Sequence, residues 1–102
     1  MSKKILITGA NGFLGSALTR FAKKKKFDVR ALVRDGSDIS NLEKLNVEIF
    51  RGDLRDKYSI NNAVTNCSIF FHAGADYRLW AKKKSEIYES NVLGTQNLID
   101  AI

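Results

Sequence analysis

Short apolar runs recur along the chain, separated by stretches in which apolar residues follow a helical spacing. The runs predict four strands, at residues 5–7, 28–34, 46–50 and 68–72. The first run is continuously apolar, which is typical of a strand covered on both faces. In the second run Val29, Ala31 and Val33 alternate with other residues, as expected for a strand.

The stretches after the strands predict helices. An apolar stripe over residues 13–22 contains two rows with steps of four, Phe13, Ala17 and Phe21 beside Leu14, Leu18 and Ala22. Ile39, Leu42 and Leu45 predict a short second helix, and Asp56 is expected to cap a third that carries Ile60, Ala63 and Val64. A last stripe lies on residues 87–102, with the members Ile87, Tyr88, Asn91, Val92, Thr95, Leu98, Ile99 and Ile102.

Strand and helix alternate four times, which predicts an α/β fold with a parallel sheet and helices on both faces. The sequence has no proline, no repeat and no low-complexity tract, and nothing marks an internal boundary. Residues 1–102 are therefore expected to form a single domain.

Composition narrows the class of protein. Of the 102 residues 44% are hydrophobic and 27% charged, and no apolar run approaches the roughly 20 residues of a membrane span. One cysteine allows no internal disulfide, and the N-terminus lacks the pattern of a secretory signal, so a cytoplasmic protein is expected. The net charge is +6, but the lysines are clumped at 23–26 and 82–84, without interleaved aromatic residues. They are interpreted as solvated helix ends, not as a nucleic-acid surface.

Three glycines, Gly9, Gly12 and Gly15, follow the first strand and open the first helix. Glycine allows a tight turn and a close approach of the backbone to a pyrophosphate, and the helix N-terminus offers free N–H groups. The spacing is G-x-x-G-x-x-G, and the alternative is a tight turn without a ligand. The position between a strand and a helix favours a dinucleotide-binding turn.

The end of the second strand favours NADP over NAD. An acidic residue at this place binds the ribose 2′-hydroxyl of NAD, whereas an arginine accommodates the 2′-phosphate of NADP. The chain has Arg34 here, with Arg30 on the same strand and Ser37 in the loop, although Asp35 follows at once. The alternative for Arg34 is an exposed strand end.

Further candidates follow the later strands, at the edge where parallel sheets bind ligands. Asp53 could accept a hydrogen bond from an adenine amino group, or it could cap backbone amides. Residues 72–75 end the fourth strand with three small residues after His72, which is interpreted as a packed strand end. Cys67 and His72 form no metal-ligand cluster. Asn91 lies on the last apolar stripe and needs a hydrogen-bonding partner, either at this edge or on another helix.

Four motifs together, "TGANGFLG", "GDLRD", "HAGA" and "NVLGT", resemble those of the extended short-chain dehydrogenase/reductase family, in order and in spacing. More narrowly, "VRALVRDGSDISNLE" and the segment from "ADYRLW" to "NVLGTQNLI" resemble the hopanoid-associated sugar epimerases, which are similar to dihydroflavonol-4-reductases. The likeness covers essentially the whole chain.

The resemblance implies a Rossmann-type sheet in the order 3-2-1-4 that binds NADP(H). The cofactor-binding residues it implies, together with those proposed above, are Gly9, Gly12, Phe13, Leu14, Gly15, Arg34, Ser37, Asp53, Leu54, Ala73, Gly74, Ala75 and Asn91. Backbone amides of Phe13 and Leu14 would bind the pyrophosphate, and Asp53 and Leu54 would lie at the adenine.

The family's catalytic Ser/Thr and Tyr-x-x-x-Lys residues lie beyond the fourth helix and have no counterpart in these 102 residues. None of the three tyrosines has a lysine four positions later. We therefore expect the cofactor-binding portion of an epimerase or reductase, not itself catalytic. The alternative is a non-catalytic dinucleotide-sensing or protein-interaction module. The fourth strand would be an edge, so we expect dimerisation or domain swapping through this edge or the last helix.

Overall fold

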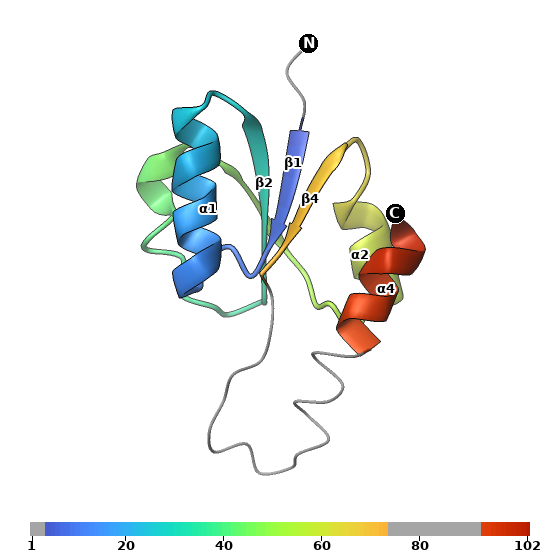
Figure 1. Cartoon of the computed structure of the whole chain (residues 1–102). Coiled ribbons are helices and arrows are strands. Elements are labelled where there is room, and N and C mark those ends of the chain that lie inside the picture. The colour runs from blue at the N-terminus through green and yellow to red at the C-terminus, as the bar shows by residue number, and fades with distance from the viewer. Residues whose placement is uncertain (1–3, 74–92) are drawn as a thin grey trace.

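The computed structural model describes residues 4–73 and 93–102. Its elements are, in order, β1 (Lys4–Thr8), α1 (Phe13–Lys24), β2 (Asp28–Val33), the 3₁₀ turn η1 (Glu43–Leu45), β3 (Glu48–Arg51), α2 (Lys57–Ala63), β4 (Ile69–His72) and α4 (Gly94–Ala101). The strands form one parallel sheet in the order β3-β2-β1-β4 (Figure 1). The predicted Rossmann-type fold and strand order are confirmed, and strand ends differ from the prediction by at most two residues.

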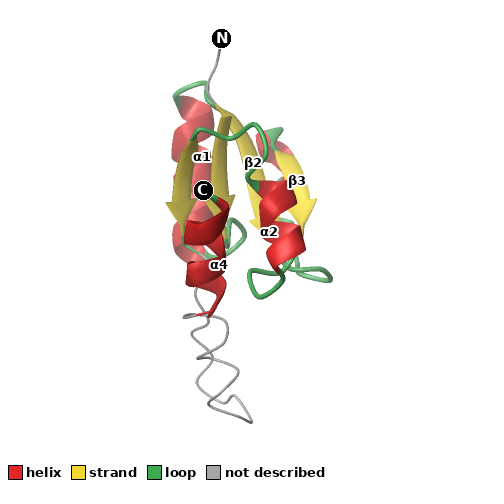
Figure 2. Ribbon diagram, turned by 90° about the vertical axis from the view of Figure 1, so that its right-hand side faces the viewer, coloured by secondary structure: helices red, strands yellow, loops and turns green. Residues whose placement is uncertain are grey.

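Helices cover both faces of the sheet. Helix α1 lies against one face, and α2 and α4 lie side by side against the other (Figures 1 and 2). Alternate strand residues divide between two apolar cores: on the α1 side Ile5, Ile7, Val29, Ala31 and Val33, and on the other side Leu6 and Leu32. Burial on both faces explains why the first strand is continuously apolar.

The apolar stripe predicted for the first helix coincides only in part with its buried face. Phe13 is 96% exposed and Phe21 61% exposed, whereas the face toward the sheet carries Gly15, Ser16, Thr19 and Ala22. The helix and the glycine turn approach too closely for a side chain at this position, because a Cβ on Gly15 would lie 2.0 Å from the Gly9 carbonyl oxygen. The buried Thr19 hydroxyl is satisfied by donating to the Gly15 carbonyl at 2.7 Å. The helical period was predicted correctly and the buried side in part, since Ala22 is buried and Leu18 packs against the same core.

Two other predictions need correction. Residues 39–45 form only a 3₁₀ turn at Glu43–Leu45, because the apolar spacing of three suits hydrogen bonds between residues three apart, such as Leu42 N–H to Ile39 O at 2.8 Å. On α4 Leu98 is buried, but Ile99 and Ile102 of the predicted stripe are exposed. The predicted cap of α2 is confirmed, since the Tyr58 N–H donates to the Asp56 carboxylate at 3.0 Å.

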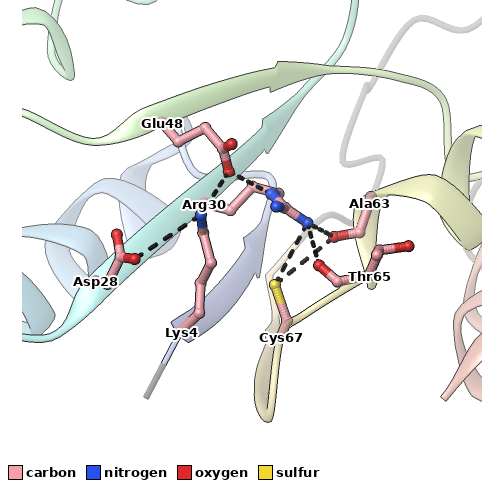
Figure 3. Close-up of polar contacts among 7 residues, drawn as sticks. All are labelled: Lys4, Asp28, Arg30, Glu48, Ala63, Thr65 and Cys67. Atoms are coloured by element: carbon pink, nitrogen blue, oxygen red, sulfur yellow. Dashed lines mark hydrogen bonds and ion pairs between the residues drawn. The ribbon is translucent and has the colours of Figure 1, made fainter. Parts of the chain in front are cut away.

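A buried arginine joins the amino-terminal ends of the strands. Arg30 of β2 is 9% exposed and forms an ion pair with Glu48 of β3. Its Nη1 also donates to the Ala63 carbonyl at 2.6 Å and to the Thr65 carbonyl at 2.7 Å (Figure 3). The guanidinium therefore connects β2 and β3 with the segment that leads from α2 into β4.

Surrounding charges complete this cluster. Lys4 Nζ lies 3.2 Å from the Glu48 carboxylate and 3.8 Å from that of Asp28 (Figure 3). The hydrogen bond from Arg30 holds the pKa of Glu48 below its usual value, whereas burial raises the pKa of the neighbouring Cys67 thiol. Glu48 is 44% exposed, but the Arg30 guanidinium is buried and bonds two backbone carbonyls, so Arg30 serves the fold. It lies at the opposite end of β2 from the predicted ligand edge.

Candidate functional site

The carboxyl ends of the four strands meet at one edge of the sheet (Figure 1). The glycine turn follows β1, residues 34–37 follow β2, residues 52–56 follow β3 and Ala73 follows β4. The described cofactor-binding candidates therefore lie along one edge, as the sequence predicts. Gly74, Ala75 and Asn91 lie outside the described residues.

The glycine turn brings the chain sharply from β1 into α1. Gly9 has a φ of +60°, a conformation that residues with a side chain rarely adopt, and the Gly12 N–H donates to its carbonyl at 3.0 Å. The close contact of Gly15 with the same carbonyl fixes the helix against the turn. Each of these glycines thus has a steric or hydrogen-bonding reason in the structure.

The N-terminus of α1 is open to an anion. Gly12 is its N-cap, no side chain caps it, and its first turn contains no acidic residue. The first N–H groups of a helix have no partner within the helix, and the helix dipole adds partial positive charge there. Phe13 and Leu14, whose amides were predicted to bind a pyrophosphate, form this first turn with exposed side chains.

Asn11, which the sequence analysis did not single out, connects the glycine turn to the loop after β2. Its Nδ2 donates to the Asp38 backbone carbonyl at 3.0 Å. The backbone carbonyl of Asn11 accepts a hydrogen bond from Asn41 Nδ2 at 2.8 Å. The Ser40 N–H bonds the Asp38 carboxylate and lowers the pKa of that group. Asparagine is common in turns, but the sequence does not show which distant loop its amide reaches.

Arg34 and Ser37 delimit a turn directly after β2. The Ser37 N–H donates to the Arg34 carbonyl at 3.1 Å, and Gly36 has a φ of +79°. The Arg34 side chain is 57% exposed, with Nη2 4.0 Å from the Asp53 carboxylate. Apart from this long contact, the Arg34 guanidinium is exposed to solvent.

The Asp53 carboxylate is held mainly by Arg55. Arg55 Nη2 donates to Oδ2 at 2.8 Å, and the Arg55 backbone N–H donates to Oδ1 at 2.9 Å. These hydrogen bonds hold the pKa of Asp53 below its usual value. The carboxylate thus caps a backbone amide, which was the alternative considered for Asp53, and its contact with an adenine stays a prediction.

An open hollow of about 430 Å³ lies between the ends of β2 and β3. It is lined by Arg34, Asp35, Arg51, Gly52, Asp53 and Ser59. Arg51 and Ser59 were not predicted from the sequence, because nothing in the spacing shows that β3 brings Arg51 opposite the end of β2.

Helix α4 holds the loop after β3 from the other side of the sheet. Asn97, 3% exposed, donates through Nδ2 to the Leu54 carbonyl at 2.9 Å, and its Oδ1 has no hydrogen-bond partner among the described residues. Gly94 packs so closely that a Cβ there would lie 2.8 Å from the Leu54 Cβ. Leu54, predicted to lie at the adenine, is therefore held by Asn97 and Gly94. Neither residue belongs to the apolar stripe predicted over residues 87–102.

His72 connects the end of β4 to β1 and α4. Its Nδ1 lies 2.7 Å from Thr8 Oγ1, and its Nε2 lies 2.8 Å from Thr95 Oγ1. The next residue, Ala73, donates its N–H to the Thr8 carbonyl at 3.3 Å. His72 is thus held at the strand end by hydrogen bonds, although it is exposed and not packed as predicted.

The profile of the NmrA-like family matches residues 1–102. The chain belongs to this family. This NmrA-like chain is 38% identical over 99 residues to a putative dihydroflavonol 4-reductase of Synechocystis sp., covering 97% of the chain and 29% of that protein. It is 39% identical over 98 residues to the 2-alkyl-3-oxoalkanoate reductase of Stenotrophomonas maltophilia. This alignment covers 96% of the chain and 29% of that reductase.

Solved structures agree with the fold. The crystal structure of gox2253 superposes with a TM-score of 0.89 at 42% identity, covering 98% of this chain and 30% of that one. The UDP-glucose 4-epimerase of Thermus thermophilus, in complex with NAD, gives 0.83 at 28% identity, covering 96% and 33%. The predicted membership of the extended short-chain dehydrogenase/reductases is confirmed.

The NmrA-like chain spans about three tenths of the length of the curated relatives that it matches. Within residues 4–73 and 93–102, no helix is both long and apolar enough to cross a bilayer. The same residues contain no group of three or more histidine, cysteine, aspartate or glutamate side chains that could hold a metal ion.

Proposed function

We propose that this chain binds a dinucleotide at the carboxyl edge of its sheet, and binds NADP(H) in preference to NAD(H). One observation carries the proposal: the uncapped N-terminus of α1 follows directly on the glycine turn. Its free N–H groups suit a pyrophosphate. The exposed Arg34 at the end of β2 supports the preference for a 2′-phosphate.

Hydride transfer at the nicotinamide is the chemistry that such a cofactor supplies when bound. Relatives named as reductases and an epimerase solved with NAD support an oxidoreductase or epimerase as the complete enzyme. The part of this chain would be to hold and orient the cofactor, with Gly74, Ala75 and Asn91 as further candidates. The chain itself is proposed to be non-catalytic, because none of its tyrosines begins a Tyr-x-x-x-Lys pair.

A single substitution separates cofactor binding from folding. Gly12 has φ −77° and ψ 177°, an ordinary N-cap conformation, but a Cβ there would lie 3.3 Å from the Gly9 carbonyl oxygen, so the turn must shift by a few tenths of an ångström. Aspartate is among the best N-cap residues, which offsets this cost, so Gly12→Asp should keep stability close to that of the wild type. Its carboxylate would occupy the amides and repel a pyrophosphate, so we expect NADPH affinity to fall by about tenfold or more. Fluorescence titration with NADPH and thermal unfolding measure the two effects.

Two further variants serve as controls. Gly12→Asn fills the same space without the charge and should lose less affinity than Gly12→Asp. Asn61→Asp, on the exposed side of α2, adds the same charge away from the site and should bind like the wild type. NADPH fluorescence that does not respond to the wild-type chain would overturn the proposal. Unchanged affinity in Gly12→Asp would place the ligand elsewhere.

We also propose self-association through the β4 edge or α4. Among the described strands β4 pairs only with β1, so its other edge offers unpaired backbone groups. Ile99 on α4 and Ile102 directly after it are exposed apolar side chains that could contribute to a contact.

A further inference from the structure

The turn that carries Arg34 and Ser37 needs external support. One hydrogen bond closes it, from the Ser37 N–H to the Arg34 carbonyl, and Gly36 within it has a positive φ. Glycine has more conformational freedom than other residues, so a short exposed turn of this kind is poorly fixed by itself. A phosphate-binding arginine on such a turn gains affinity if its backbone is fixed beforehand.

Arg51 supplies this support from the neighbouring strand. It stands opposite Val33 in the register of β2 and β3, at the last position of β3. Its Nη1 lies 3.2 Å from the Arg34 carbonyl oxygen and 3.4 Å from the Ser37 carbonyl oxygen, and donates to both. One guanidinium nitrogen therefore holds both ends of the turn.

The remaining donors of Arg51 are available to a ligand. Among the residues that the structure describes, no acceptor bonds its Nε or Nη2. The same side chain lines the open hollow next to Arg34. Guanidinium groups present several N–H donors in a plane, which suits the oxygens of a phosphate.

The charges around the hollow favour an anion. Arg34 and Arg51 line it together with the carboxylates of Asp35 and Asp53. Asp53 is neutralised in large part by Arg55, whose guanidinium and backbone N–H both bond it. Two cations therefore face one uncompensated carboxylate, and the net positive charge that remains favours a phosphate monoester.

We propose that Arg51 is a positioning and specificity residue for the ribose 2′-phosphate. It fixes the turn that presents Arg34 and Ser37, and it adds a second guanidinium to the hollow. This inference rests on the proposed function, because it assumes that a dinucleotide binds at the same edge. It concerns discrimination between NADP(H) and NAD(H), not the binding of the pyrophosphate.

Selectivity is the property to measure. NADPH and NADH are titrated by fluorescence against the wild-type chain, Arg51→Met and Arg51→Lys, with Lys24→Met as the control. Lys24 is an exposed cation in the last turn of α1, at the opposite end of the sheet. Lys24→Met therefore changes the net charge as Arg51→Met does, but away from the hollow. We expect Arg51→Met to lose about tenfold in NADPH affinity, the size of a charged hydrogen bond, and to keep NADH affinity within about twofold.

Arg51→Lys tests the guanidinium donors that face the hollow. Lysine keeps the cation and one nitrogen that can bond the turn carbonyls, as Nη1 does, but it lacks Nε and Nη2. NADPH affinity should therefore fall between those of the wild type and Arg51→Met. Full NADPH affinity in Arg51→Lys would overturn the role of these two donors. If Arg51→Met does not fold, as judged by circular dichroism, the ratio of NADPH to NADH affinity in Arg51→Lys decides, and a ratio equal to that of the wild type overturns the inference.

The outcomes distinguish this inference from the proposed function. A wild-type chain that binds neither dinucleotide overturns the proposed function, and the inference with it. A wild-type chain that binds NADPH more tightly than NADH, together with an Arg51→Met variant of unchanged selectivity, overturns only the role of Arg51. An equal loss of NADPH and NADH affinity in Arg51→Met would show a merely structural residue and would also overturn it.

Discussion

His72 is the residue at which two strands and a helix meet. Its two ring nitrogens lie within hydrogen-bond distance of Thr8 and Thr95, so a neutral imidazole can donate through one nitrogen and accept through the other. Desolvation at this position lowers its pKa, because the charged form loses hydration that the protein does not replace. The folded chain therefore binds a proton at His72 less readily than the unfolded chain does.

This difference predicts a pH dependence of stability. Above the pKa of the unfolded state, about 6.5, His72 is neutral in both states and its contribution to the free energy of unfolding is fully present. As the pH falls through about 6.5 toward the lower folded pKa, the unfolded state takes up the proton first and the free energy of unfolding decreases. His72 is the only histidine of the chain, so His72→Gln should flatten the curve between about pH 7 and pH 5.5. Urea unfolding at several pH values measures this, and an equal slope in both proteins would contradict it.

At the level of elements, the end of α1 places a lysine in a conformation that glycine usually adopts. The Phe27 N–H donates to the Ala22 carbonyl at 3.0 Å and the Lys26 N–H to the Lys23 carbonyl at 2.9 Å, which together form a Schellman motif. Lys26 has the left-handed φ of +66° that this motif requires. Glycine is the residue that usually occupies such a position.

Two lysine-to-glycine substitutions two positions apart should therefore have opposite effects. Lys26→Gly relieves the left-handed strain and should raise the free energy of unfolding by about 0.5–1 kcal/mol. Lys24→Gly lies inside the last helical turn and should lower it by about 1 kcal/mol. Both remove one charge, so each is the control for the other in urea unfolding. Two changes of the same sign would contradict the assignment of the helix end.

Sequence patterns predicted the elements better than their orientation. The strands were found because burial on both faces requires continuous apolar runs, and the Asp56 cap because it acts on adjacent residues. The buried face of α1 was predicted only in part, because the close contact of Gly15 with the Gly9 carbonyl depends on tertiary packing. Arg51 and Asn97 were missed for the same reason, since each contacts a segment distant in the sequence.

For the whole molecule, the exposed sheet edge and the outer side of α4 predict self-association. Phe71 on β4 and Ile99 on α4 are 40% and 60% exposed. Burial of such side chains between two copies is favourable, although a net charge of +6 per chain opposes it at low salt. We expect sedimentation equilibrium to show association at high concentration, more strongly at high salt.

Charged substitutions identify the surface. Ile99→Lys should weaken association if α4 forms the contact, and Phe71→Lys should do so if the β4 edge forms it. Asn61→Lys adds the same charge on the exposed side of α2 and should leave association unchanged. A wild-type chain that remains monomeric at high concentration would contradict the prediction.

The central place of β1 in the sheet also predicts the order in which the strands pair during folding. β1 and β2 are joined by the short α1 connection, whereas the contact between Thr8 and His72 closes a loop of 64 residues. Closure of a longer loop costs more entropy, so β4 should pair last, during refolding and during synthesis. Until then one side of β1 has no partner strand, and a nascent or refolding chain is most prone to aggregate through this edge.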